Sequence, residues 1–435
     1  MHKSKYALII LSLLVFSTSC VEKVNEYKKG NVIFIHPDGT GLATWNALRI
    51  LTKGADGNLN WDNLPAIGLY RSHTKNSITT SSNAGATMHA YGVKVPYHSY
   101  GMNETEELTS LSGKRMGIMR EAQFQGIKVG IINSGSIIEP GTGVFTASEI
   151  KRDMYESIAK KIVQSGADVI LSGGEEWLLP IGVNGRFGEG KRTDGLDLVD
   201  WAKQNKYKVV FNRKELLALG SDVEKVLGVF AYVNTFNDME EEEQQKLNLP
   251  HFNPEAPTLA EMTESAIKIL AKNNSQFFLV VEEEATDNFP NYNNASGTLE
   301  ALRRADEAIN VAQNFLKTNP NTLLFVASDS EAGGMEVIGP PSQWLLEDSP
   351  LPKSDKNGAP ADGPDGTSSL PFMSAPDQFG NSYPFYIAWS TLYDGYGGVV
   401  ARADGLNSEF CKGSFDNTDV YRIMYLTLFG TNLWK

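Results

Sequence analysis

Short apolar segments that end in acidic or hydroxyl-bearing residues recur along this chain and alternate with longer amphipathic segments. Apolar runs bounded by Gly, Asn or Asp are typical of strands buried on both faces of a sheet. We expect strands at 32–36, 128–133, 167–172, 209–212, 277–282 and 322–327, and helices at 114–125, 150–165, 258–272 and 298–317. This alternation predicts an α/β fold, a three-layer α/β/α sandwich with a central, mostly parallel sheet.

Three stretches add detail to this expectation. Thr258 is followed three residues later by Glu261, which predicts a capping box at a helix start. The acidic run Met239–Gln245 favours a solvated helix face. The stretch 340–383 is rich in Pro, Gly, Asp and Ser and has weak periodicity, so we expect it to form a cap or insertion over the active site. No linker divides the remainder, and residues 31–435 are predicted to form one catalytic domain.

The N-terminus has the pattern of an export signal. Lys3 and Lys5 precede an apolar run at 6–16, and small residues then lead to Cys20. This pattern predicts a signal peptide over residues 1–19. We interpret Cys20 as the lipidated first residue of a periplasmic or outer-membrane lipoprotein of a Gram-negative bacterium. Ordinary secretion with cleavage nearby is the alternative.

Charge and cysteine content limit the classes of partner. The 435-residue chain has a formal net charge of -13, which disfavours nucleic acid and anionic membranes as partners. A phosphate site on such a chain needs a local positive field, most simply from bound cations. If Cys20 is acylated, at the start of a polar linker over 20–30, Cys411 has no partner, and no intrachain disulfide is expected.

Chemistry-bearing residues end or follow three of the predicted strands and open one predicted helix. Asp38 enters a glycine turn, and Ser82 is followed by small residues that suit a helix start, where backbone N–H groups favour an anion. Glu282, Asp287 and Asp329 follow two later strands. Because ligands of open α/β sheets bind at the carboxyl ends of strands, we expect these side chains to meet.

In order and spacing these segments resemble the alkaline phosphatase family. That family has an Asp-Gly turn after its first strand, a nucleophile segment ending in glycine ten residues after the serine, and later strands ending in Val-Glu and Asp-His. Ser82 to Gly92 keeps the interval, and Arg152 with Tyr155 and the segment 415–419 are also similar. The resemblance covers residues 30–430.

The resemblance implies a phosphomonoesterase that works through a phosphoseryl intermediate with two or three divalent cations. Ser82 would take the phosphoryl group and Arg152 would grip phosphate oxygens with its planar guanidinium. The implied metal ligands are Asp38 as a bridge, Ser82 and Asp329 on the nucleophile side, Asp287 on the leaving-group side, and Glu282 with Thr142 for magnesium. An ungapped count from Arg152 gives Gly141 in place of Thr142.

The histidines of the family's zinc sites are replaced. Their positions hold Asn291, Ser330, and either Asp394 or Tyr396, and Ser81 stands where the family has an acid before the nucleophile. Zinc prefers nitrogen and sulfur ligands, whereas oxygen ligands suit magnesium, calcium or manganese. Three outcomes remain open: a site for harder cations, histidines from elsewhere, or a degraded metal site.

His36 and His89 are the two histidines expected near the site, and a structural role is favoured for each over metal ligation. The leading function is hydrolysis of a small phosphorylated substrate. The alternatives are hydrolysis of a phosphodiester or sulfate ester, and a catalytically degenerate surface lipoprotein. A lipid anchor would be the only membrane contact, no nucleic acid is expected, and a homodimer is left open.

Overall fold

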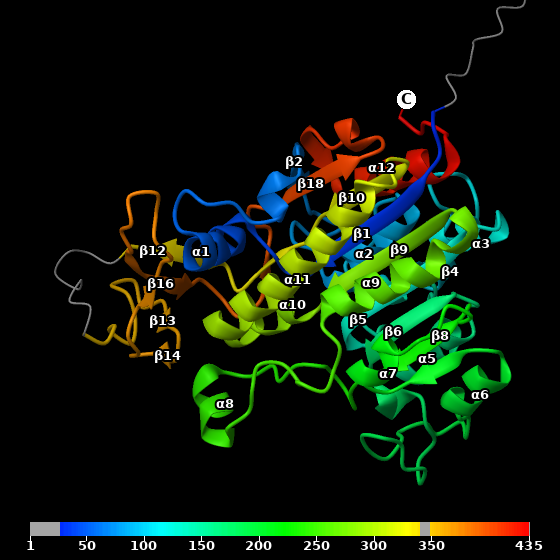
Figure 1. Ribbon diagram of the computed structural model, residues 1–435, viewed down its shortest axis with the longest axis horizontal. Helices are drawn as coiled ribbons and strands as arrows, with labels where there is room; N and C mark the ends of the chain where they lie inside the picture. The colour runs from blue at the N-terminus through cyan, green and yellow to red at the C-terminus, as the bar shows by residue number, and fades with distance from the viewer. Residues whose placement is uncertain (1–26, 340–348, 435) are drawn as a thin grey trace, which may run out of the picture.

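The computed structural model describes residues 27–339 and 349–434 of the chain. A ten-stranded sheet crosses the molecule (Figure 1). Its strands, in spatial order, are β19 (Gly413–Asp416), β2 (Ala66–Arg71), β18 (Val400–Gly405), β10 (Thr322–Val326), β1 (Asn31–Pro37), β9 (Phe277–Glu283), β5 (Lys128–Ser136), β6 (Val169–Gly173), β8 (Val226–Val229) and β7 (Lys208–Val210). Strand β18 runs antiparallel to both neighbours, and the other pairs are parallel. The predicted mostly parallel sheet is confirmed.

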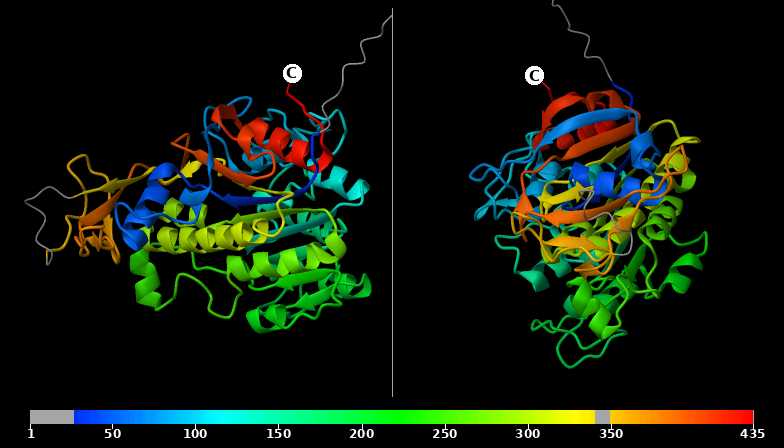
Figure 2. Two further views of the ribbon diagram at one scale, coloured as in Figure 1. Left: turned by 45° about the horizontal axis from the view of Figure 1, so that its top comes forward. Right: turned by 90° about the vertical axis from the view of Figure 1, so that its left-hand side faces the viewer.

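Helices cover both faces of this sheet, as the sandwich prediction requires (Figures 1 and 2). One core contains residues of α2 (Ser82–Tyr91), α3 (Ile118–Phe124), α5 (Tyr155–Val163), α6 (Leu198–Gln204) and α12 (Asn417–Phe429). The core on the opposite face contains residues of α1 (Leu42–Lys53), α7 (Arg213–Leu217), α9 (Leu259–Leu270) and α11 (Ala295–Leu316). The carboxyl ends of the central strands therefore lie between two helical layers.

Strand β1 shows why its sequence is continuously apolar. Val32 and Phe34 pack into the α2-side core, and Ile33 and Ile35 pack into the α9-side core. All four side chains are fully buried. Each contributes about 1.5–3 kcal/mol of hydrophobic free energy, so the strand is held rigidly where it delivers its last residues to the site.

The predicted helices are present, but two begin later than expected. The helix predicted at 114–125 begins at Ile118 after an extended Gly117, and the helix predicted at 150–165 begins at Tyr155. The residues that precede Tyr155 are in bend, turn and coil geometry and include Arg152. The predicted capping box at Thr258 and Glu261 is confirmed.

A second, five-stranded sheet lies at one end of the molecule (Figures 1 and 2). Its strands are β12 (Met335–Ile338), β13 (Ala361–Gly363), β14 (Gly366–Thr367), β15 (Phe372–Met373) and β16 (Pro384–Trp389). The fully buried Trp389 anchors it by donating its indole N–H to Asp362 at 2.5 Å. The stretch 340–383 thus contributes the short strands β13, β14 and β15 to this sheet, and residues 340–348 lie outside the described residues.

Much of the acidic run at 239–245 lies in α8 (Glu241–Leu247), and the predicted solvated face does not include two of its residues. Glu241 and Gln244 are buried, because α8 packs them against the start of α11. Burial, reinforced by the charge of Asp362, raises the pKa of Glu241 to about 9. Glu241 therefore retains its proton in the folded protein at neutral pH.

The stability of the protein should consequently fall as pH rises through this region. In the unfolded chain Glu241 loses its proton near its ordinary pKa of 4.5, whereas the folded protein keeps it to about 9. Between these values the folded state binds more protons, so stability falls by up to about 1.4 kcal/mol per pH unit. We expect Glu241→Gln to make this slope shallower in denaturant titrations between about pH 5 and 9. Glu243→Gln, in a more exposed ion pair with Lys246, is the control and should keep it; equal slopes in all three proteins would contradict the prediction.

Residues 1–26 lie outside the described residues, so the predicted signal peptide, Cys20 and most of the linker stay predictions. Among the helices that the structure describes, none is long and apolar enough to cross a bilayer. Cys411 is buried and its thiol is free.

Candidate active site

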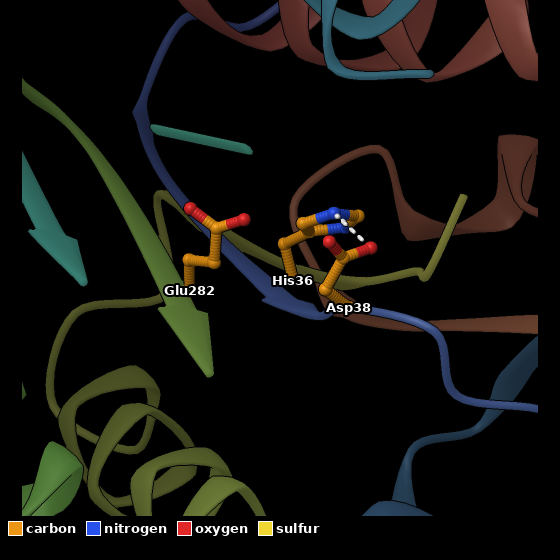
Figure 3. Close-up of side chains that lie close together, drawn as sticks. All are labelled: His36, Asp38 and Glu282. Carbon is orange, nitrogen blue, oxygen red and sulfur yellow. Dashed lines mark ion pairs between the residues drawn. The ribbon is translucent and has the colours of Figure 1, made fainter. Parts of the chain in front are cut away.

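Three adjacent strands carry polar side chains in register at their carboxyl ends. His36 of β1 pairs with Glu282 of β9, and Glu282 pairs with Asn133 of β5. The side chains of His36, Asp38 and Glu282 project to one side of their strands (Figure 3). Their candidate ligand atoms lie within 4.8 Å of one another, and all three residues are buried. Parallel register thus produces a polar cluster from residues almost 250 positions apart.

Asp38 follows β1 in a turn that requires glycine. Gly39 has a φ of +61°, and its N–H donates to Asp38 Oδ1 at 2.9 Å. A Cβ built on Gly39 would lie 2.5 Å from Asp287 Oδ1. The absence of a side chain therefore permits both the left-handed backbone and the close approach of Asp287.

Ser82 is the first residue of α2 and is buried beside Asp38. Ser81 is the N-cap, and its hydroxyl accepts from the N–H of Ala84 at 3.4 Å. Ser82 lies close enough for its hydrogen bond to help lower the pKa of Asp38. One turn on, a Cβ on Gly85 would be 2.2 Å from Asp329 Oδ2, so the small residues after Ser82 allow Asp329 to lie against the helix.

Asp287, Asn291 and Asp394 form a second part of the site. Asp287 lies in α10 (Ala285–Asn288), and Asn291 Nδ2 donates to its Oδ2 at 2.9 Å. Asp394 begins β17 (Asp394–Gly395), which pairs with β11 (Glu331–Ala332) just after Asp329. Asp394 acts electrostatically on Asp287 and lines the pocket beside Ser82, whereas Tyr396 is not among the residues that line this pocket in the described structure. Of the two alternatives, the structure brings Asp394 into the site.

Thr142 joins the cluster through Asn133. Thr142 is in α4 (Pro140–Gly143), and its hydroxyl accepts from Asn133 Nδ2 at 3.1 Å. The same Nδ2 donates to Glu282 Oε2. A Cβ on Gly141 would be 1.7 Å from Glu282 Oε1. Thr142 thus supplies the side-chain oxygen near Glu282, and Gly141 leaves room for the carboxylate.

Many oxygen atoms in this cluster lack a hydrogen-bond donor within the described residues. They include both carboxylate oxygens of Asp329 and the Ser330 hydroxyl, together with one side-chain oxygen each of Glu282, Glu284, Asp287 and Asn291. A buried acceptor without a donor costs about 1–3 kcal/mol, and more if it is charged. The ligands that satisfy several such oxygens at once are cations.

Burial and repulsion between neighbouring carboxylates also shift the pKa values of the clustered acids. Burial raises the pKa of Glu282 to about 8 and that of Asp394 to about 6, and the charge of Asp38 adds to both effects. Burial and neighbouring carboxylates also raise the pKa of Asp329 and Asp287 well above the ordinary range. Burial acts to raise the pKa of Asp38 too, but the hydrogen bond and charge of His36 outweigh it and lower that pKa.

A pocket of about 900 Å³ opens beside Ser82. Asp287, Asn291, Asp394 and Arg152 line it, and no residue of the described part of 340–383 does so. Arg152 is partly exposed and makes an ion pair with Glu139, with Nη2 and Oε2 2.8 Å apart. The predicted position of the 340–383 stretch over the site is therefore not seen in its described part.

The sequence analysis did not identify Asn133 or Glu139 as members of this site, and it favoured a structural role for His36. Asn133 is the last residue of a predicted strand, so the rule that found Glu282 could have found it. Glu139 lies in no sequence pattern that would have indicated a role in the site. His89 has the predicted structural role, because its Nε2 is 2.7 Å from the Tyr70 hydroxyl, whereas His36 lies inside the carboxylate cluster.

The site fits divalent cations. Clustered carboxylates with unpaired oxygens, a buried hydroxyl at a helix N-terminus and an open pocket with an arginine define a metal-assisted hydrolase centre on an α/β sheet. Residues that could hold cations are Asp38, Ser82, Thr142, Glu282, Asp287, Asn291, Asp329, Ser330 and Asp394.

Comparisons with known proteins agree with this class. The alkaline phosphatase family model matches residues 29–359. Tissue-nonspecific alkaline phosphatase of Rattus norvegicus is 29% identical over 347 residues, which cover 71% of this chain and 64% of that protein. Alkaline phosphatase of Escherichia fergusonii is 26% identical over 351 residues, which cover 73% of each chain.

Solved structures share the fold. Alkaline phosphatase from the Antarctic bacterium TAB5 is 22% identical with a TM-score of 0.70, over 93% of this chain and 100% of that one. The enzyme of Thermus thermophilus is 21% identical with a TM-score of 0.70, over 96% of each chain. The chain belongs to the alkaline phosphatase family, whose members are hydrolases.

Removing and restoring metal should test the fit of the site. Because cations that bind the folded state alone stabilise it by mass action, metal-free protein given a divalent cation in excess should melt at least about 5 °C higher. Asp329→Asn should melt higher than wild type without metal, since it removes an acid that the neighbouring carboxylates disfavour, and should gain less from metal. Asp222→Asn, at an exposed position, is the control. Calorimetry that shows no metal effect on wild type would contradict the prediction.

Proposed function

We propose that this protein is a phosphomonoesterase that forms a phosphoseryl intermediate at Ser82. The observation that carries the proposal is the position of Ser82: it begins α2, lies against Asp38, and faces a pocket that also contains Arg152 and Asp287. A nucleophile, an anion-binding helix start and a guanidinium around one pocket suit transfer of a phosphoryl group.

Two displacements complete the reaction. In the first, Ser82 Oγ forms a bond to phosphorus as the ester oxygen leaves, the serine proton is released, and the leaving oxygen takes up a proton. In the second, water attacks phosphorus, the bond to Ser82 Oγ breaks, and inorganic phosphate is released. Bound divalent cations would supply positive charge opposite the phosphate oxygens and lower the pKa of hydroxyl groups near them.

Support for magnesium comes from the oxygen-rich ligand set. Glu282, Thr142 and Asp38 offer hard oxygen ligands of the kind magnesium prefers. A crystal structure of a mutant of TAB5 alkaline phosphatase has magnesium bound in its M3 site. Reconstitution of the chelated protein with one cation at a time distinguishes magnesium from zinc, calcium and manganese.

The first experiment measures hydrolysis of p-nitrophenyl phosphate by chelated protein that is resupplied with one cation at a time. Bis-p-nitrophenyl phosphate and p-nitrophenyl sulfate serve as competing ester classes. We expect the monoester to be the best substrate, and Ser82→Ala to lower kcat at least about 1,000-fold, because the nucleophile is lost.

Ser81→Ala is the matched control, since it removes the neighbouring hydroxyl and leaves the nucleophile. Loss of this N-cap should cost about 1 kcal/mol of stability and keep turnover within about tenfold. A Ser82→Ala variant as active as wild type would exclude the phosphoseryl route. A preference for the diester or the sulfate would reassign the substrate class.

Arg152 should act through its planar fork and not through charge alone. Arg152→Lys keeps the charge but loses bidentate contact with phosphate, so kcat/KM should fall about 10- to 100-fold. Arg115→Lys, at an exposed ion pair with Glu107, should leave kcat/KM unchanged. Equal kcat/KM values for Arg152→Lys and wild type would show that Arg152 does not grip the phosphate.

A further inference from the structure

His36 is a buried histidine whose hydrogen bonding defines its tautomer. Its Nδ1 is 2.8 Å from the backbone carbonyl oxygen of Ala327. A carbonyl oxygen can only accept a hydrogen bond, so Nδ1 carries the proton in this contact. In the neutral ring the lone pair is therefore on Nε2.

The lone pair of His36 Nε2 faces carboxylate oxygens, which are also electron-pair donors. Nε2 is 3.3 Å from Asp38 Oδ1; a doubly protonated ring would form an ion pair there, whereas the neutral ring has no proton on Nε2 to donate. Glu282, the register partner of His36, contributes an oxygen that also lacks a donor. A nitrogen lone pair and two carboxylates directed at one another need a positive centre between them.

The surroundings of His36 exclude several sources of that positive centre. His89 lies beside the ring, with centroids 5.6 Å apart; its Nε2 is engaged with Tyr70 and its Nδ1 has no hydrogen-bond partner among the described residues, so it does not donate to His36. Phe34, which packs against both His36 and His89, is apolar. Arg152 is engaged with Glu139 at the pocket wall. What remains is a proton on His36 itself or a bound cation.

We propose that His36 Nε2, together with Asp38 and Glu282, ligates a divalent transition-metal ion. The arrangement matches the rule that a metal-bound histidine donates its other N–H to a backbone carbonyl or carboxylate, which holds the ring in position. The inference rests on the proposed function, because the cation would belong to the same site. It deepens that function by giving the site a nitrogen ligand of its own.

The donor set determines which metal this position prefers. Carboxylates alone favour magnesium, calcium or manganese, whereas one imidazole nitrogen moves the preference toward zinc or cobalt. The histidine positions that this chain has replaced, at Asn291, Ser330 and Asp394, are then compensated from a different element, strand β1. This corner of the site would bind zinc or cobalt more tightly than calcium.

X-ray absorption of the cobalt-loaded wild-type protein tests the proposal directly. Bound cobalt should show the outer-shell scattering of an imidazole ring. His36→Gln should remove that scattering and lower the affinity for cobalt at least about 10-fold in calorimetric titration. His98→Gln, an exposed histidine on the pocket wall, should keep both.

Wild-type protein that binds cobalt without imidazole scattering, or His36→Gln that retains the scattering, would overturn the proposal. The first result would mean that His36 is itself the positive centre. The wild-type spectrum decides even if His36→Gln does not fold. Either result would overturn the role of His36 but not the proposed function, because phosphatase activity with magnesium would persist. Imidazole scattering in a protein without phosphatase activity would instead sink the function and keep the ligand.

Discussion

Mutual repulsion of buried carboxylates is the constraint on which the site of this protein depends. Asp38, Asp287 and Asp329 are buried and act on one another electrostatically. At 4 Å, two such charges repel by about 4 kcal/mol for an effective dielectric constant of 20. The fold brings them together through parallel strands that end at one edge, and glycines at positions 39 and 85 remove the side chains that would keep them apart. Such a cluster is stable when protons or cations neutralise it.

The need of the carboxylate cluster for cations also bears on how an acidic protein would bind the proposed anionic substrate. The net charge of -13 does not attract a phosphate ester at long range. Local positive charge is therefore needed at the pocket, and the ion pair of Arg152 with Glu139 shows that the guanidinium is partly neutralised by the protein itself. Cations held by the carboxylate cluster would be a further source of positive charge, and metal binding would then take part in recognition of the proposed substrate as well as in chemistry.

The predicted site residues that the structure brings together are those whose position follows from a strand end. Asp38, Glu282 and Asp329 come directly from buried central strands, so their meeting follows from sheet topology. Asp394 could not be chosen over Tyr396, because it enters the site through the two-residue pairing of β17 with β11, which has no periodic signal. Glu241 was assigned to a solvated face because an acidic helix does not reveal which neighbour it packs against.

The position of His36 in the site is only partly predictable from the sequence. Alternation along β1 places it on the same side as Asp38, two residues on, and register with β9 places it opposite Glu282. The alternation can be read from the sequence, but the register with β9 is visible only when the strands are paired. A ligand in a fully buried central strand is held by packing on both faces, and such rigid support gives more precise geometry than a loop does. The nitrogen donor proposed at His36 would therefore stand on rigid support.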